Sequence, residues 1–228
     1  MGVLREKPAR YWVKIKVPQA NIWRRPLRNL SKLSARARRR NLQTQALRTD
    51  LPLRVWGEQA GWRLVQMADL TSGWVQNRYT EKVPAKNYWR NVKRLKSGVV
   101  DLPLTAAKFL DALKKYPAVK YVWGGRSAQG RDCSACVQDV FYKQTGYLLP
   151  RNSRDQISFG RVVRTMKVGD LVFGYGRADG VAHIGIAAGD MTVFHLSHYW
   201  NRPKIEKIEE MRPRYRLVKI KRIFNFHD

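Results

Sequence analysis

The pattern of apolar residues in the last third of the chain most constrains the fold. Four apolar, turn-bounded segments there predict strands: "DLVFGYG" from residue 170, "AHIGIAAG" from 182, "MTVFHLS" from 191 and "RLVKIKRIF" from 216. Three helices are expected before them, at 104–116, 133–145 and 151–160. Helices followed by a run of hairpin-linked strands predict an α+β domain.

The first third of the chain has a different pattern. Residues 10–22 and 51–79 are rich in Val, Trp and Tyr and are broken by Gly and Asp turns, which predicts short strands in a small β-barrel. Residues 24–48 hold nine Lys or Arg and no acidic residue. Leu27, Leu30 and Leu33 recur there at helical spacing, so an amphipathic helix or a loop is expected.

The charge balance limits the surroundings of the protein. There are 45 Lys and Arg against 17 Asp and Glu, a formal net charge of +28, which predicts a polyanionic partner. Nucleic acid, anionic lipid head groups and bacterial envelope polymers would all satisfy this charge. No apolar run approaches the ~20 residues that a membrane span needs. The opening residues "MGVLREKPARYW" lack the apolar core of a signal peptide.

The two cysteines of the chain, Cys133 and Cys136, stand three residues apart. Two cysteines cannot build a disulfide framework, and a structural zinc site would need four ligands, so no metal site is expected. A thioredoxin-type CxxC motif is disfavoured because the surrounding element order differs from that fold. Cys136 is expected in the core, where free cysteine acts as a small apolar residue.

Cys133 has features of a nucleophile. Asp132 is a good helix N-cap, which places Cys133 in the first helical turn, near unpaired backbone N–H groups and the positive end of the helix dipole. Both effects are expected to favour the thiolate. The same N–H groups could hold an oxyanion on an attacked carbonyl. A buried structural role for this cysteine remains the alternative.

A cysteine nucleophile needs a base, and the base needs an orienting partner. His183 begins one expected strand and His195 lies on the next, across the tight "AGD" turn. An antiparallel hairpin can bring two such side chains together. His183 as base and His195 as its partner is therefore possible, although a lone strand histidine is more often structural.

Six segments in order, "YVWGG", "DCSACVQDVF", "LPRNSRDQ", "VGDLVFG", "AHIGIAAGD" and "FHLSH", resemble the NlpC/p60 cysteine peptidases, which cut the stem peptides of bacterial peptidoglycan. The resemblance covers residues 101 to about 224 and implies a papain-like catalytic domain. It implies that Cys133 is the nucleophile, His183 the base and His195 its orienting residue. Tyr121 would support the oxyanion site.

The resemblance also implies a substrate cleft lined by Asp132, Ser134, Arg151 and Ser153. An Asp there suits a substrate amine, and an Arg suits a D-glutamate or diaminopimelate carboxylate. The Gly-Leu that usually follows the family's DCS motif is here Ala135-Cys136, which bears on how closely a substrate backbone can pass.

Residues 10 to 82 resemble a bacterial SH3 domain, more weakly. The expected organisation is an SH3-like domain at 8–84 with a basic insertion at about 27–46, a linker at 85–100 and the catalytic domain at 101–228. Trp23, Trp56, Trp62 and Trp74 are expected mainly in its core.

The resemblance implies a cell-wall hydrolase that cleaves the γ-D-glutamyl to diaminopimelate or Lys amide bond without a cofactor, in the periplasm, in the cell wall or after secretion. Anionic envelope polymers are expected partners of the basic surface, with nucleic acid a less favoured partner. Two alternatives stay open: a binding protein for nucleic acid or envelope polymer with a degenerate peptidase site, and a Cys-dependent acyltransferase.

Overall fold

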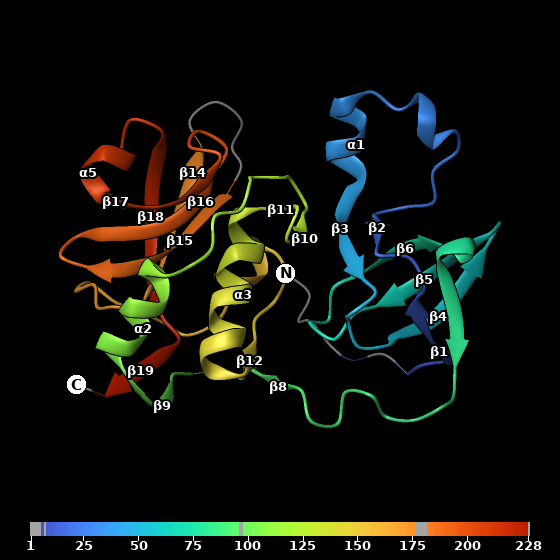
Figure 1. Ribbon diagram of the computed structural model, residues 1–228, viewed down its shortest axis with the longest axis horizontal. Coiled ribbons are helices and arrows are strands. Elements are labelled where there is room, and N and C mark those ends of the chain that lie inside the picture. The colour runs from blue at the N-terminus through green and yellow to red at the C-terminus, as the bar shows by residue number, and fades with distance from the viewer. Residues whose placement is uncertain (1–5, 7, 96–97, 177–181, 228) are drawn as a thin grey trace. The chain divides into compact units, whose positions relative to one another are not determined.

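The structure is a computed structural model that describes residues 6, 8–95, 98–176 and 182–227 (Figure 1). The chain divides into two compact units. The first contains residues 1–92 together with 123–127, and the second contains residues 93–122 and 128–228. None of the helices in the described ranges is long and apolar enough to cross a membrane.

The first unit is built on one antiparallel sheet with the strand order β3-β2-β6-β5-β4-β1-β7. Its strands are β1 (Tyr11–Ile15), β2 (Gln19–Trp23), β3 (Leu42–Leu47), β4 (Leu53–Gln59), β5 (Trp62–Gln66), β6 (Ser72–Gln76) and β7 (Thr80–Val83), with the 3-10 helix η2 (Asn77–Tyr79) before the last. Alternate side chains such as Val13, Ile15, Val55 and Val65 are fully or almost fully buried and form one core. This arrangement follows from the period-two pattern of the sequence. Within the described residues β3 and β7 are the two edges of the sheet, and the likeness to an SH3 domain stays a prediction.

The basic segment of this unit has three parts. The 3-10 helix η1 (Leu30–Lys32) is followed by helix α1 (Ala35–Asn41) and then by β3, so the segment is neither a single helix nor a loop. Ser34 caps α1 by accepting a hydrogen bond from the backbone N–H of Ala37 at 3.2 Å. The cationic side chains are exposed: Arg24, Arg25, Arg28, Lys32, Arg36, Arg38, Arg39, Arg40 and Arg48.

Two contacts extend this unit beyond its sheet. Trp89, in the range expected as a linker, is buried, and its indole N–H donates to the Pro52 carbonyl at 2.9 Å. Arg126 contributes from the 123–127 segment, because its guanidinium contacts Asp50 at 2.7 Å and donates to the Gln45 carbonyl at 3.1 Å. Trp23 and Trp62 are buried as expected, whereas Trp56 and Trp74 are only partly buried.

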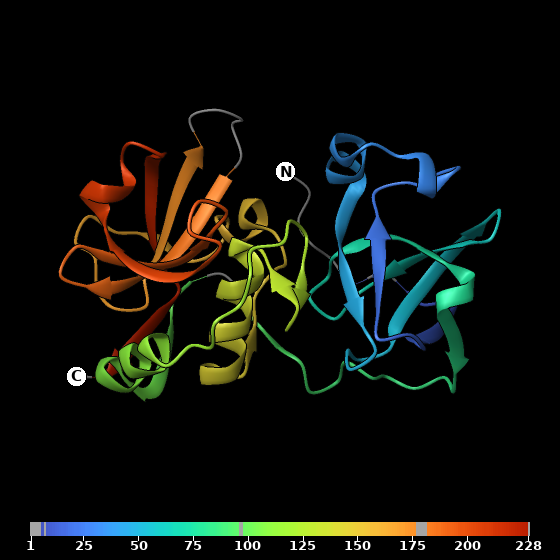
Figure 2. The same cartoon turned by 45° about the horizontal axis from the view of Figure 1, so that its top comes forward.

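The second unit holds a six-stranded antiparallel sheet with the order β13-β18-β14-β15-β16-β17 (Figures 1 and 2). Its strands are β13 (Arg161–Val162), β14 (Leu171–Gly176), β15 (Ala182–Gly189), β16 (Thr192–Ser197), β17 (Arg202–Lys207) and β18 (Tyr215–Arg222). The expected strands at 170, 182, 191 and 216 are confirmed. The strand β17 was not predicted.

The helices of this unit are α2 (Ala106–Lys114), α3 (Cys133–Thr145), α4 (Ser153–Gln156) and α5 (Ile208–Met211). Two short strand pairs belong to it: β8 (Lys93–Arg94) with β12 (Tyr147–Leu148), and β9 (Val100–Thr105) with β19 (Phe224–His227). The short strand β11 (Gly130–Arg131) also lies in this unit, whereas β10 (Arg126–Ser127) lies in the first unit. Helix α3 packs against β15 and β16. The rings of Phe109, Phe141 and Phe224 stack in series between α2, α3 and β19, and together with Ile184 and Leu196 of the sheet they form the main core. The predicted α+β class is confirmed.

Candidate active site

The candidate nucleophile opens helix α3. Asp132 is the N-cap, with extended backbone, and its carboxylate accepts a hydrogen bond from the backbone N–H of Ala135 at 2.9 Å. Cys133 is the first helical residue and is buried, with 7% of its surface exposed. The helix ends at Gly146, whose φ of 73° is the left-handed geometry that glycine adopts most easily. The predicted bounds of this helix are therefore confirmed.

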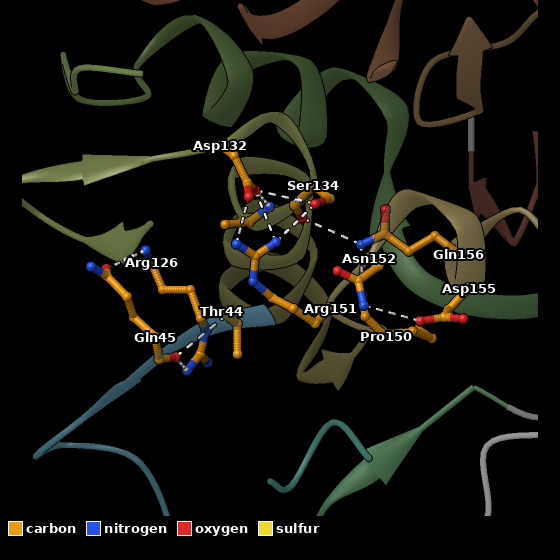
Figure 3. A network of polar contacts seen from close by, with 11 residues as sticks. Thr44, Gln45, Arg126, Asp132, Ser134, Pro150, Arg151, Asn152, Asp155 and Gln156 are labelled. Atoms are coloured by element: carbon orange, nitrogen blue, oxygen red, sulfur yellow. Dashed lines mark hydrogen bonds and ion pairs between the residues drawn. The ribbon is translucent and has the colours of Figure 1, made fainter. Parts of the chain in front are cut away.

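A buried ion pair lies beside the nucleophile (Figure 3). The Arg151 guanidinium makes two hydrogen bonds to the Asp132 carboxylate, at 2.8 and 2.6 Å, and a third to the Ser134 hydroxyl at 2.8 Å. Ser134 in turn donates to Asp132 at 3.1 Å. Arg151 is only 1% exposed, so this bidentate pair is formed inside the protein.

The segment after Arg151 is fixed to the same helix start. The Gln156 amide donates to the Pro150 carbonyl at 2.7 Å and to the Ser134 carbonyl at 3.3 Å (Figure 3). Ser153 opens α4 and is buried. Asp132, Ser134 and Arg151 thus form one cluster, held together with the segment that carries Ser153. Their roles toward a substrate stay predictions.

The two histidines meet as the hairpin was expected to bring them together. Nε2 of His183 on β15 lies 2.9 Å from Nδ1 of His195 on β16, and both residues are buried. Gly185 permits this close approach, because a Cβ added there would lie 2.4 Å from the Val193 side chain and 2.8 Å from the Phe194 carbonyl oxygen. The glycine two residues after His183 is thus a steric condition for the histidine pair.

The nucleophile and the histidines belong to one site. The backbone N–H of Ile184, the residue after His183, hydrogen bonds to the Cys133 sulfur and lowers its pKa. The His183 ring stacks on the Tyr215 ring at 4.2 Å, with 9° between the ring planes. The thiol, the first imidazole and a flat aromatic support are thereby assembled from α3, β15 and β18.

A carboxylate that was not predicted lies behind the histidines. Glu206 on β17 is 3% exposed, and its Oε2 lies 3.0 Å from Nε2 of His195. The Trp200 indole N–H donates to the same oxygen at 3.2 Å, and Arg214 donates to Oε1. Lys204 lies 3.8 Å from Oε1. The sequence feature that could have indicated Glu206 is a glutamate inside the charged, extended stretch "RPKIEK".

The protonation states differ from the expected thiolate. Burial raises the pKa of the Cys133 thiol to about 12, and the nearby Asp132 carboxylate raises it too, against the lowering effects of Arg151 and two backbone N–H groups. Burial, followed by His195, holds the pKa of His183 well below its usual value. The expectation of a resting thiolate was wrong, because desolvation outweighs the helix start. Both shifts favour the neutral thiol and the neutral imidazole.

The remaining candidates lie as follows. The Tyr121 backbone N–H donates to the Asn201 side chain at 2.9 Å, and its ring lies 5.9 Å from His198. The proposed oxyanion role of Tyr121 stays a prediction. Cys136 is 1% exposed in the core, as expected. Both cysteines are free, and the described residues contain no group of three or more His, Cys, Asp or Glu arranged to hold a metal ion.

Comparisons with known proteins point to one family. The model of the NlpC/P60 family matches residues 118–222. The chain is 35% identical over 108 residues to the γ-D-glutamyl-L-lysine dipeptidyl-peptidase of Bacillus subtilis, a match covering 46% of this chain and 34% of that protein. It is 33% identical over 93 residues to the murein DD-endopeptidase MepS/murein LD-carboxypeptidase of Escherichia coli K12, covering 40% and 49%. The matched part spans less than half the length of either relative.

A solved structure supports the fold. NlpC1 from Trichomonas vaginalis superposes with a TM-score of 0.51 at 14% identity, covering 96% of this chain and 95% of that one. The second unit therefore has the papain-like architecture that its sequence predicted. Residues 118–222, which contain the cysteine, both histidines and the arginine cluster, form an NlpC/P60 family domain.

Proposed function

We propose that the protein is a cysteine peptidase of the bacterial cell wall. The observation that carries this proposal is the alignment of His183 and His195 at 2.9 Å beside a helix-start cysteine that bonds to the Ile184 N–H. Such a set is suited to amide hydrolysis, which needs a nucleophile, a base and a residue that orients the base. The names of the two bacterial relatives, which concern γ-D-glutamyl and murein bonds, support peptidoglycan stem peptides as the substrate.

The proposed reaction starts from the neutral pair. Cys133 attacks the substrate carbonyl carbon while its proton passes to Nδ1 of His183. The tetrahedral oxyanion is stabilised at the start of α3, with the Tyr121 hydroxyl as the further proposed donor. His183 then gives the proton to the leaving amine, and the acyl group stays on the sulfur as a thioester. A water molecule, deprotonated by His183, releases the acid and restores the thiol.

The proposed bond joins γ-D-glutamate to diaminopimelate or lysine. Asp132 is proposed to bind a substrate amine, and Arg151 to bind a substrate carboxylate or to hold Asp132 in place for the amine. The 2.6 and 2.8 Å contacts between the two favour the second role for Arg151. Ser134 and Ser153 are proposed to line the same cleft. A substrate of this kind implies action in the periplasm, in the cell wall or after secretion.

The deciding experiment is mass spectrometry of L-Ala-γ-D-Glu-diaminopimelate peptides and of whole peptidoglycan after incubation with the protein. The wild type is expected to cleave, Cys133→Ala is expected to lose cleavage, and Cys136→Ala, which keeps the nucleophile, is expected to retain it. Cleavage by a folded Cys133→Ala variant would refute the mechanism. A folded wild type that cuts no stem peptide would refute the substrate and favour acyl transfer or binding.

We also propose that the exposed cations of residues 24–48 attach the protein to anionic envelope polymers. Eight of these nine cations are arginine, whose planar guanidinium pairs well with phosphate or carboxylate. Residues 24–48 contain no aromatic residue, and Trp23 directly before them is 4% exposed, which disfavours the base stacking typical of single-stranded nucleic acid binding. Salt is expected to release the protein from cell-wall sacculi while leaving cleavage of a small peptide unchanged. Tighter retention by nucleic acid than by sacculi would contradict this attachment.

A further inference from the structure

Glu206 is a buried carboxylate that packing alone does not explain. It faces the histidine side of the sheet from β17, where its backbone pairs opposite Val193 of β16. Placing an ionised carboxylate in the interior is costly unless several donors bind it. Here three groups donate to it: His195, Trp200 and Arg214. An apolar residue would fill the position without needing these partners.

We infer that Glu206 is a positioning residue of the proposed peptidase, acting on the base His183 through His195. This inference rests on the function proposed above. The geometry that carries it is a continuous series of hydrogen bonds, with 2.9 Å between His183 and His195 and 3.0 Å between His195 and Glu206. Each contact joins defined ring nitrogens, so the series determines where the protons lie.

The tautomers follow from the acceptor at the end of the series. Burial raises the pKa of Glu206, but the hydrogen bonds from Arg214, Trp200 and His195 outweigh it, so the carboxyl is ionised at neutral pH. A carboxylate only accepts, hence Nε2 of His195 carries a hydrogen and Nδ1 of the neutral ring is bare. That bare nitrogen accepts from Nε2–H of His183. Nδ1 of His183 is then left unprotonated and can take the Cys133 proton.

Glu206 also balances the charge that forms during the reaction. When His183 takes the thiol proton, positive charge develops on two buried imidazoles whose pKa burial has lowered. The carboxylate raises the pKa of His195 by hydrogen bonding and by charge. Arg214 and Lys204 oppose this by repelling a protonated ring, while Arg214 also keeps Glu206 ionised. The titratable and charged groups around the pair are Glu206 and Lys204 from β17, Arg214 before β18, Tyr215 from β18, His198 after β16 and Cys133 from α3.

The test replaces Glu206 with glutamine, which keeps the size but can donate to His195 and impose the wrong tautomer. For Glu206→Gln we expect kcat to fall roughly 100-fold, the range of a general-base contribution, with KM nearly unchanged. The acid limb of the kcat/KM profile should move to lower pH, because the variant lacks the charge that raises the pKa of His195. Glu209→Gln removes an exposed acid nearby and should change neither quantity.

A second readout needs no substrate. The rate of Cys133 alkylation by iodoacetamide, followed by peptide mass spectrometry, depends on His183 accepting the thiol proton, so in Glu206→Gln it should fall and its pH dependence should shift the same way. This arm remains informative even if stem peptides are not the substrate. A folded Glu206→Gln variant with wild-type kcat, pH profile and alkylation rate would overturn the inference.

Should Glu206→Gln fail to fold, the wild type supplies the test. Long-range ¹H–¹⁵N NMR of the histidine side chains reports which ring nitrogen carries the hydrogen. Hydrogen on Nε2 of both His183 and His195 is expected at neutral pH. Hydrogen on Nδ1 of either ring would overturn the inference.

Discussion

Two buried carboxylates serve this site, and both bind an arginine. Asp132 stands beside the nucleophile, capping α3 and pairing with Arg151, which is 1% exposed. Glu206 stands behind the base, and its partner Arg214 has a side chain that is 23% exposed. In the first ion pair the arginine is the fully buried partner and the Asp132 side chain is 13% exposed, and the pair ties helix α3 to the segment before α4. In the second the carboxylate is the buried partner, the arginine is partly exposed, and the pair stands at the end of the hydrogen-bond series from His183 through His195. A carboxylate paired with arginine thus stabilises the structure at Asp132, whereas at Glu206 it is suited to set the protonation of the histidines.

The largest expected effect is a loss of unfolding free energy when the Asp132–Arg151 ion pair is broken. Arg151→Met leaves Asp132 buried without its cationic partner, and breaking such a pair typically costs about 3–5 kcal/mol of unfolding free energy. Urea unfolding should show a lower midpoint with an unchanged m-value. Arg154→Met, which alters an exposed arginine three residues later on the short helix α4, is the matched control. A loss below about 1 kcal/mol would show that the Asp132 pair is not structural.

The glycine that lets the histidines meet gives the next effect. Gly185→Ala places a methyl group 2.4 Å from Val193 and 2.8 Å from a backbone oxygen, so β16 must shift. Overpacking of this kind typically costs about 1–3 kcal/mol. We expect a lower melting temperature together with a lower kcat, because the His183 to His195 contact lengthens. Gly57→Ala meets its nearest atom at 3.5 Å and should leave both unchanged, and equal effects of the two substitutions would contradict this account.

Acidic pH should lower the stability of the folded protein through the two buried histidines. The pKa values of His183 and His195 lie below 6.5 in the folded protein, so below that pH the unfolded chain binds protons that the folded one does not. Stability is fully present above about pH 6.5 and falls as pH drops toward the folded values, by at most about 1.4 kcal/mol per pH unit for each histidine. Melting temperatures at pH 7.5, 6.5 and 5.5 measure this. His183→Gln should give a flatter curve, and an unchanged slope would contradict the assignment.

The smallest expected effect comes from breaking the ion pair between Glu206 and Arg214. Arg214→Met leaves Trp200 and His195 donating to Glu206 and Lys204 3.8 Å from it, so the unfolding free energy should fall by less than in Arg151→Met. Chemical unfolding beside Arg151→Met makes the direct comparison. Equal losses of unfolding free energy in the two arginine variants would contradict the difference between a structural ion pair at Asp132 and one that sets histidine protonation at Glu206.

The two carboxylates also show what the sequence could predict. Asp132, Cys133 and helix α3 follow local rules of capping and periodicity, so their positions were predicted correctly. The histidine pair was predicted because a tight turn joins two clearly apolar strands. Glu206 was missed because its strand carries charged residues at alternate positions and the glutamate occupies a buried place where an apolar residue is expected.

Other differences have physical causes of the same kind. The expected thiolate was wrong because burial, which depends on the packing of α3 against β15 and β16, raises the pKa of Cys133. The basic segment ends in a strand rather than continuing as a helix or loop because β3 pairs with β2, which is a tertiary contact. Both outcomes depend on residues distant in sequence, which local patterns do not specify.

Asp132 has two structural roles, and both limit how this site can be redesigned. Its carboxylate caps the helix that carries Cys133 and also binds the buried Arg151. Replacing Asp132 to accept a new substrate would therefore also weaken the contacts that hold the Cys133 thiol in place. Directed evolution of substrate choice should therefore leave this position fixed. Variation is better tolerated at Tyr199, which is 48% exposed, lies 5.8 Å from the Tyr215 ring and forms no part of the cap.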